Sequence, residues 1–241
     1  MKSLDTTGIH KGNVVIRRLE ALYGDASLGE HNRKERRDPF WLIVETILSQ
    51  NTSAANSAAA FQRLTCKYTA LGELAAADVY EVEATIKQAG LYTAKARSIV
   101  SLAREIEDEF AGDTWLLLAG PYESARKRLL TLAGIGEKTA DVVLLFARGF
   151  QIIPVDTHIF RVSRRIGLAP QKGSYDAVKN ALEEQILPAK RRFAHVALIK
   201  LGREICSART PQHWKCPLTD ICNYYQEATY GASQKAHSFK V

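Results

Sequence analysis

The sequence predicts an all-α fold, and three observations support that prediction. Through most of the chain, apolar residues recur with the three-to-four-residue spacing of a buried helix face. Short turns rich in Gly, Pro or Asp separate these stretches, and no alternation of apolar and polar residues with period two persists. Hydrophobic residues make up 46% and charged residues 24% of 241 positions, which is the balance of an ordinary globular protein. The length suffices for one large core or two small ones.

The first strongly buried helix is predicted between Asp38 and Gln50. Asp38 suits the capping position and Pro39 the first helical turn. After this helix we expect further ones at about 53–66, 78–89, 92–110, 121–132, 137–148, 157–166, 174–186 and 190–205. Only the segment 151–155 reads as extended, and Pro154 argues against the centre of a sheet.

Charge and hydropathy limit the partners and the location. Lys plus Arg number 33 and Asp plus Glu number 26, which gives a net charge of +7 and makes a polyanion a reasonable partner. No apolar run approaches the roughly 20 residues of a membrane-spanning helix, and the first residues lack the apolar core of a signal peptide. We therefore expect an intracellular protein, in the cytoplasm or nucleoid, with no membrane partner.

Three of the four cysteines, Cys206, Cys216 and Cys222, fall near the C-terminus. Since nothing marks the chain for export, metal ligation is a better interpretation of this clustering than a disulfide framework. The fourth, Cys66, stands apart, and we expect it to be a small buried thiol on a helix.

Gly134-Ile135-Gly136 joins two predicted helices. Glycines permit a tight turn, and without side chains they let a phosphate approach the amide groups at the start of the next helix. Ile135 is expected to anchor the turn in the core. The Gly-x-Gly pattern alone is weak evidence, but the following Glu-Lys-Thr-Ala-Asp and apolar helix make it much more specific.

Lys138 stands in the first turn of the second helix, where the helix dipole disfavours a cation. A lysine near that end and an apolar wall keeps more of its amine uncharged, and the uncharged amine is the form that attacks an electrophilic carbon. Asp156 begins a later helix, which its carboxylate suits as a cap. If the chain doubles back, we expect this carboxylate to lie near Lys138, to accept a proton and to stabilise a developing sugar cation.

The segments LAGIGEKTADVV at 132–143 and VDTHIFRV at 155–162 resemble the helix-hairpin-helix and Gly/Pro-Asp motif of the endonuclease III branch of DNA glycosylases. The likeness covers roughly residues 14–226. In that family the lysine attacks the sugar C1′ of a damaged nucleotide, expels the base and forms an imine that breaks the strand by β-elimination. Lys138 and Asp156 match the lysine and the aspartate. Relatives that only excise bases usually lack this lysine, so its presence implies AP lyase activity as well as base removal.

The resemblance implies double-stranded DNA with a damaged base or an abasic site as the partner, and we expect the protein to be a monomer. Such enzymes extrude the target nucleotide and fill the gap with polar side chains, and Gln50 and Asn51 in ILSQNTS are our candidates for that wedge. Arg161 is expected on a solvated or phosphate-facing edge. Two positions depart from the family: Ala54 replaces an acidic residue, and Ala133 replaces the proline of the hairpin. Neither departure removes a reacting group, but the first bears on which lesion is accepted.

Family members often end in four cysteines that hold a [4Fe-4S] cluster. Cys206, Cys216 and Cys222 match the first, third and fourth of these cysteines, and His213 stands at the second position. Histidine replaces cysteine as an iron ligand in Rieske centres, so a cluster with three cysteines and one histidine is the favoured interpretation. A Cys3His zinc site and a loop without metal remain as alternatives.

The fold that the family implies has two lobes. We expect residues 33–150 to form a contiguous helical bundle with the hairpin, residues 1–32 plus 151–230 a second lobe with the cluster loop, and residues 231–241 a disordered tail. The expected function is a bifunctional glycosylase and AP lyase that excises damaged pyrimidines. Two alternatives stay open: a monofunctional mismatch or uracil glycosylase, which leaves the strand intact, and a DNA-binding helix-hairpin-helix protein without catalysis.

Overall fold

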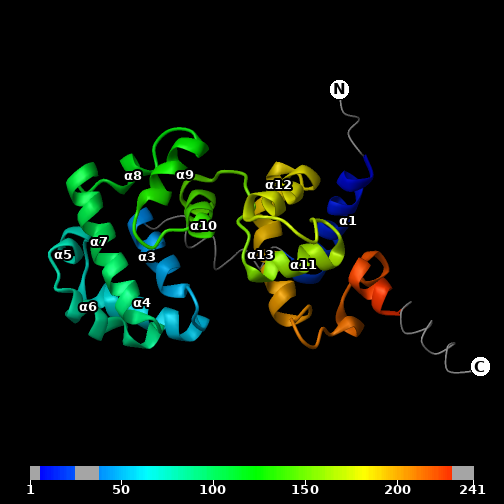
Figure 1. The fold of residues 1–241 in the computed structure, drawn as a ribbon, viewed down its shortest axis with the longest axis horizontal. Helices are drawn as coiled ribbons and strands as arrows, with labels where there is room; N and C mark the ends of the chain where they lie inside the picture. The colour runs from blue at the N-terminus through cyan, green and yellow to red at the C-terminus, as the bar shows by residue number, and fades with distance from the viewer. Residues whose placement is uncertain (1–5, 25–37, 230–241) are drawn as a thin grey trace, which may run out of the picture. The chain divides into compact units, whose positions relative to one another are not determined.

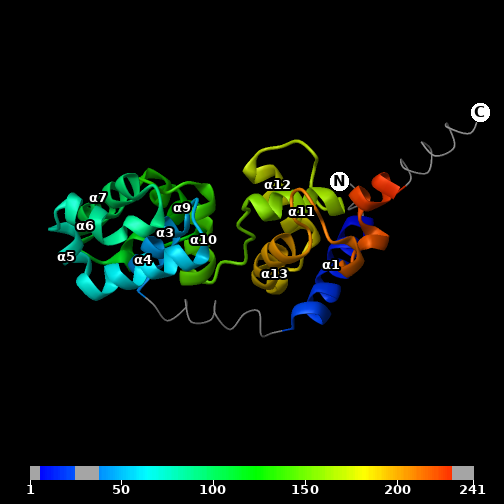
Figure 2. The same ribbon diagram turned by 90° about the horizontal axis from the view of Figure 1, so that it is seen from below.

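The computed structural model describes residues 6–24 and 38–229, and these residues confirm the all-α prediction because they contain helices and no strand. Contacts along the chain define two compact units, residues 1–31 with 151–241 and residues 32–150. Figures 1 and 2 draw the helices of both units. The expected tail at 231–241 lies outside the described residues.

The unit of residues 32–150 is built around α3 (Pro39–Ser49), which packs against α4, α7, α8 and α10. Asp38 caps this helix by accepting a hydrogen bond from the Phe40 amide at 2.8 Å, and Pro39 occupies its first turn, as predicted. The other helices of this unit are α4 (Ala54–Lys67), α5 (Leu71–Ala75), α6 (Val79–Ile86), α7 (Tyr92–Phe110), α8 (Thr114–Leu117), α9 (Tyr122–Thr131) and α10 (Glu137–Arg148). A short 3-10 turn, Lys87–Ala89, lies between α6 and α7.

The other unit packs α11 (Thr157–Ile166) against α13 (Arg191–Glu204), and the two helices lie side by side in both views (Figures 1 and 2). Their approach requires Gly202, because a Cβ there would come within 2.8 Å of the His158 Cβ. The helices α1 (Thr6–Tyr23) and α12 (Tyr175–Gln185) complete the core of this unit.

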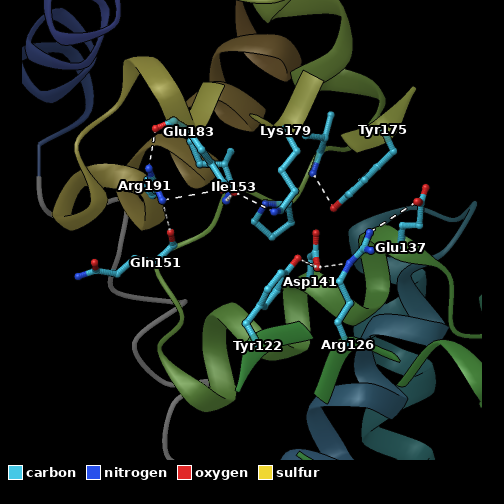
Figure 3. A network of polar contacts seen from close by, with 12 residues as sticks. Tyr122, Arg126, Glu137, Asp141, Gln151, Ile153, Tyr175, Lys179, Glu183 and Arg191 are labelled. Atoms are coloured by element: carbon cyan, nitrogen blue, oxygen red, sulfur yellow. Dashed lines mark hydrogen bonds and ion pairs between the residues drawn. The ribbon is translucent and has the colours of Figure 1, made fainter. Parts of the chain in front are cut away.

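The segment 151–155 is neither helix nor strand, and side chains bind its backbone groups. The Gln151 carbonyl accepts from Arg191 at 2.7 Å, the Ile153 amide donates to Glu183 at 2.9 Å, and the Val155 amide donates to the Tyr175 hydroxyl at 3.2 Å (Figure 3). Side chains thus satisfy the backbone groups that a sheet would otherwise have to satisfy. This arrangement fixes the stretch of chain that leads to Asp156.

One expectation about a cysteine is wrong: Cys66 is exposed on α4. The buried positions of this helix are Ala60 and Leu64, four residues apart. Cys66 follows Leu64 by two positions and therefore points to the opposite side of the helix.

Candidate active site

The turn between α9 and α10 depends on Gly134. This glycine has φ of 80°, a left-handed conformation that favours glycine. A Cβ on it would lie 2.6 Å from the Ser98 hydroxyl oxygen of α7. Ile135 is buried, with 6% of its surface exposed, as the sequence predicts. The hairpin is thus held closely against α7 by a residue without a side chain and by an apolar anchor.

Gly136 is the N-cap of α10, and no side chain caps this helix. A Cβ added to Gly136 would meet no atom within 4 Å, so the space in front of the helix is open. The first amides of a helix lack partners within the helix, and together with the helix dipole they favour an anion. The geometry of Gly134, Ile135 and Gly136 suits the phosphate cradle that the sequence predicts, and phosphate binding itself stays a prediction.

Lys138 is the second residue of α10 and is half-buried. The sequence therefore places it correctly, in the first turn of the helix that follows the hairpin. One turn further along, a buried carboxylate that the sequence analysis overlooked links α10 to α9.

That carboxylate is Asp141, which has no exposed surface. It accepts a hydrogen bond from the Tyr122 hydroxyl at 2.7 Å and one from Arg126 Nε at 3.0 Å (Figure 3). Arg126 also pairs with Glu137 at 3.5 Å, and burial raises the pKa of the Tyr122 phenol. These four side chains clamp α9 to α10 below the hairpin turn. An aspartate between Ala140 and Val142, within an apolar stretch, was the signal in the sequence.

The structure brings Gln50 to the hairpin. Its side-chain amide donates to the Gly134 carbonyl at 3.2 Å and to the Thr139 hydroxyl at 3.3 Å. Asn51, by contrast, is exposed and has a left-handed φ of 50°. Of the two candidates for the wedge, Asn51 is therefore the exposed one, while Gln50 connects its own turn to the hairpin; insertion into DNA stays a prediction.

Two further residues next to this turn were missed from the sequence. Lys95 of α7 is buried, and its ammonium donates to the carbonyls of Leu48, Gln50 and Ala89 at 2.8, 2.6 and 2.8 Å. Leu91, at the N-cap of α7, is 62% exposed and has a left-handed φ of 48°. A lysine on the apolar face of a helix is a signal in the sequence, whereas the exposure of a leucine is not.

Asp156 lies in the other unit, at the N-cap of α11, where its carboxylate accepts from the Ile159 amide at 2.8 Å. The capping role is confirmed. Just before it, the Pro154 carbonyl accepts from Nδ1 of the buried His195 at 2.8 Å. Side chains from other elements thus hold the backbone of the segment just before Asp156, and Asp156 begins the helix that follows this segment. Its pairing with Lys138 stays a prediction.

Arg161 directs its guanidinium to the protein backbone. Nε donates to the Cys206 carbonyl at 3.0 Å and a terminal nitrogen donates to the Gly202 carbonyl at 2.8 Å. The same terminal nitrogen lies 3.1 Å from Nδ1 of His158, so this histidine has a structural partner. The contacts of Arg161 connect α11 to the end of α13, and its expected contact with phosphate stays a prediction.

The C-terminal candidates border one small cavity of about 20 Å³. Its lining includes Cys206, His213, Cys216 and Cys222. The His213 ring is half-buried, in an edge contact with Tyr225 at 4.9 Å between centroids. Among the described residues, no three side chains of His, Cys, Asp or Glu are grouped so as to hold a metal ion. The four predicted ligands therefore border a shared space instead of converging on a point.

Arg165 connects two of these cysteines. Its guanidinium donates to the Cys206 sulfur at 3.3 Å, and its carbonyl accepts from the Cys222 thiol at 3.3 Å. The guanidinium also lies 4.4 Å from the centroid of the Tyr224 ring. Burial raises the pKa of the Cys216 and Cys222 thiols. A metal would have to offset that burial cost to hold them as thiolates.

No helix in the described parts of the chain combines the length and the apolar character needed to cross a membrane. Residues 44–188 match the HhH-GPD superfamily of base excision DNA repair proteins. The chain is 33% identical over 190 residues to endonuclease III of Bacillus subtilis, covering 79% of this chain and 83% of that protein. It is 34% identical over 194 residues to endonuclease III of Sulfolobus acidocaldarius, covering 78% of this chain and 83% of that protein.

A solved structure of a trapped covalent intermediate between an endonuclease III and DNA is also similar. Its TM-score is 0.78 at 30% identity, over 92% of this chain and 98% of that one. This chain thus contains the hairpin, the lysine that follows it and the aspartate at a helix start, and it matches these proteins over most of its length. The chain belongs to the HhH-GPD superfamily of base excision DNA repair proteins and, within it, to the endonuclease III family.

Proposed function

We propose that this DNA glycosylase and AP lyase uses Lys138 as its nucleophile and Asp156 as its electrostatic and proton-transfer partner. The observation that carries the assignment is the place of Lys138, in the first turn of α10 behind a hairpin whose helix start has no side-chain cap. A DNA phosphate held at that helix start would bring the adjoining sugar close to the lysine. The substrate class we propose is damaged pyrimidines in duplex DNA, and we propose that the protein works inside the cell, where its DNA substrate is.

The chemistry follows from the groups present. The uncharged amine of Lys138 attacks C1′, the bond from C1′ to the base breaks, and the base leaves with the electron pair of that bond and takes up a proton. The nitrogen on C1′ becomes an iminium as the sugar ring opens. Loss of a proton from C2′ then expels the phosphate on C3′, which cleaves the strand. The Asp156 carboxylate would stabilise the positive charge that develops on the sugar and accept the proton of the amine.

Extrusion of the nucleotide leaves a gap in the duplex, and we assign its filling to Asn51 and Leu91. Both side chains are exposed on neighbouring turns that share the ammonium of Lys95. A polar amide can pair with an orphaned base, and an apolar side chain can wedge between base steps. Leu91 thus adds an apolar member to the polar wedge expected from the sequence.

We further propose that the C-terminal pocket holds a [4Fe-4S] cluster through Cys206, His213, Cys216 and Cys222. Three thiols and one imidazole around a shared space suit a cluster in which each iron takes one protein ligand. When bound, such a cluster supplies electron-transfer capacity and a rigid link between the loop segments. The residues of this chain supply its surroundings: Arg165 donates to a cysteine sulfur, and Arg209 and Lys215 give the loop positive charge for DNA.

A strand-cleavage assay without alkali tests the bifunctional assignment. Duplexes that carry an oxidised, a deaminated or an abasic pyrimidine position are incubated with the full chain, and the products are separated with and without alkali. We expect strand cleavage at the abasic site and at the preferred lesion before alkali is added. Base release with an intact strand would instead support the monofunctional alternative, and neither product would support the DNA-binding alternative.

A further inference from the structure

Lys95 is a buried cation that the reaction scheme does not use. Only 3% of its surface is exposed, and the three hydrogens of its ammonium match the three carbonyls at 2.6 to 2.8 Å. Two of these carbonyls, on Leu48 and Gln50, belong to the end of α3, where unpaired carbonyls and the helix dipole favour a cation. The third, on Ala89, belongs to the turn that precedes α7. One amine therefore joins two loops that are about 40 residues apart in the sequence.

Each loop contains a residue with a left-handed backbone close to a carbonyl that Lys95 binds: Asn51 directly follows Gln50, and Leu91 lies two residues after Ala89. Asn51 has φ of 50° and Leu91 has φ of 48°. Within the described ranges, Ala111 is the one other residue besides glycine with a positive φ. A left-handed conformation is unfavourable for a residue other than glycine, and more so for leucine than for asparagine. Strain of this kind persists where the surroundings impose it, and it concentrates at functional sites.

Burying the amine carries its own cost, because burial lowers the pKa of Lys95 and so disfavours its charged form. An apolar residue would fill the same space without that cost, but it would leave three buried carbonyls without their donor. The buried ammonium of Lys95 therefore contributes by fixing the positions of the two turns. Their side chains, Asn51 and Leu91, are the ones that project to the surface.

We propose that Lys95 is a positioning residue that holds the Asn51 turn and the Leu91 turn together as one preformed, two-pronged wedge for entering duplex DNA. The inference rests on the proposed function, in which these two side chains replace the extruded nucleotide. Lys95 itself touches neither the DNA nor the reacting atoms. Its contribution appears only when a nucleotide has to be drawn out of a duplex.

The test compares one reaction on two substrates. The variant Lys95→Met and the wild-type chain are given the same abasic site in a duplex and in a single strand, and cleavage is measured under single-turnover conditions. The chemistry at Lys138 is identical in both, but only the duplex requires a wedge. We expect Lys95→Met to slow cleavage of the duplex by about tenfold to a hundredfold, as a misplaced positioning group does, and to change cleavage of the single strand by less than about twofold.

Lys179→Met is the matched control. Lys179 is a second buried lysine, paired with Glu183 at 3.2 Å in the other unit. Its loss should leave the ratio of duplex to single-strand cleavage unchanged. In a chain that already carries Asn51→Ala and Leu91→Ala, adding Lys95→Met should cost less than about a further twofold, since the prongs it positions are gone.

Equal losses on both substrates in Lys95→Met would overturn the inference and would assign Lys95 to stability alone. If this variant does not fold, Lys95→Gln, which keeps two N–H donors, is measured in the same way. An unchanged ratio in the folded glutamine variant would likewise overturn the inference. A wild-type chain that cleaves neither substrate would overturn the proposed function, and with it the inference, so the two failures are distinguishable.

Discussion

Replacing Asp141 by alanine should destabilise the unit of residues 32–150 far more than the loss of one surface charge. The carboxylate has no exposed surface, and it receives hydrogen bonds from Tyr122 and Arg126 at 2.7 and 3.0 Å. Its removal leaves the Arg126 side chain, which is only 13% exposed, without the carboxylate on its buried side. The side-chain contacts that hold α9 against α10, the two helices joined by the hairpin, would then be lost.

The magnitude follows from the burial of the pair. Removing one partner of a buried ion pair typically costs about 3–5 kcal/mol. The lower end applies here, because Arg126 keeps Glu137 at 3.5 Å, a carboxylate whose side chain is 48% exposed. For a unit of this size, about 3 kcal/mol corresponds to a fall in Tm of roughly 12 °C. Tyr122→Phe, which removes one hydrogen bond to the same carboxylate, should cost about 1–2 kcal/mol.

Calorimetric or circular-dichroism melting of the full chain measures these shifts. Glu81→Gln is the matched control, since Glu81 pairs with Lys67 at 3.0 Å on the surface. Such exposed pairs contribute little, so this variant should melt close to the wild type. A Tm for Asp141→Ala that matches that of Glu81→Gln would show that the buried carboxylate does not hold α9 to α10.

Three further outcomes are expected. His213→Cys should lower the reduction potential of the bound cluster, because histidine ligands raise it. His213→Ala should reduce the iron content of the purified protein. Unchanged iron content and visible absorbance in His213→Ala would show that His213 is not a ligand. A hydrogen bond from the Arg18 guanidinium lowers the pKa of Asp220 from its ordinary 3.8. The pair therefore stabilises the fold at pH values above 3.8 and loses this effect as acid protonates the folded carboxylate. The difference in Tm between wild type and Asp220→Asn should shrink below about pH 4, and a difference that stays constant would contradict this. Gly134→Ala should weaken binding to duplex DNA and lower Tm. The added Cβ would lie 2.6 Å from the Ser98 hydroxyl oxygen, and the φ of 80° at this position disfavours any residue with a side chain. Unchanged affinity for DNA would show that the hairpin does not contact the phosphate.

Local patterns in the sequence sufficed for most of the helices and for the hairpin. Asp38 and Pro39 begin α3 as predicted, because capping and the first turn depend on adjacent residues. The short helices α5 and α8 were missed, since four or five residues carry no periodic pattern. The single helix expected over 78–89 ends at Ile86 and continues as a 3-10 turn, which leads into the strained turn at Leu91.

In the candidate site, too, the sequence predicts some residues and their elements but not the contacts between distant parts of the chain. Lys138, Gly134 and Gly136 follow from adjacent residues, and the sequence locates each of them on its element. Two of the three carbonyls that Lys95 binds lie 45 and 47 residues away, at the end of α3, and the partners of Asp141 lie 15 and 19 residues away, on α9. A sequence shows that such a charge lies on an apolar face, but only packing decides which carbonyl or guanidinium meets it.

In the proposed mechanism the amine of Lys138 forms a covalent bond with the sugar, and borohydride trapping detects that bond. The full chain is mixed with a duplex that contains an abasic site, reduced with borohydride, digested and sequenced by mass spectrometry. We expect a stable protein–DNA adduct with the added mass on Lys138, and none in Lys138→Gln, while that variant still binds the duplex. An adduct of equal yield in Lys138→Gln, or one located on another residue of the wild-type chain, would contradict it.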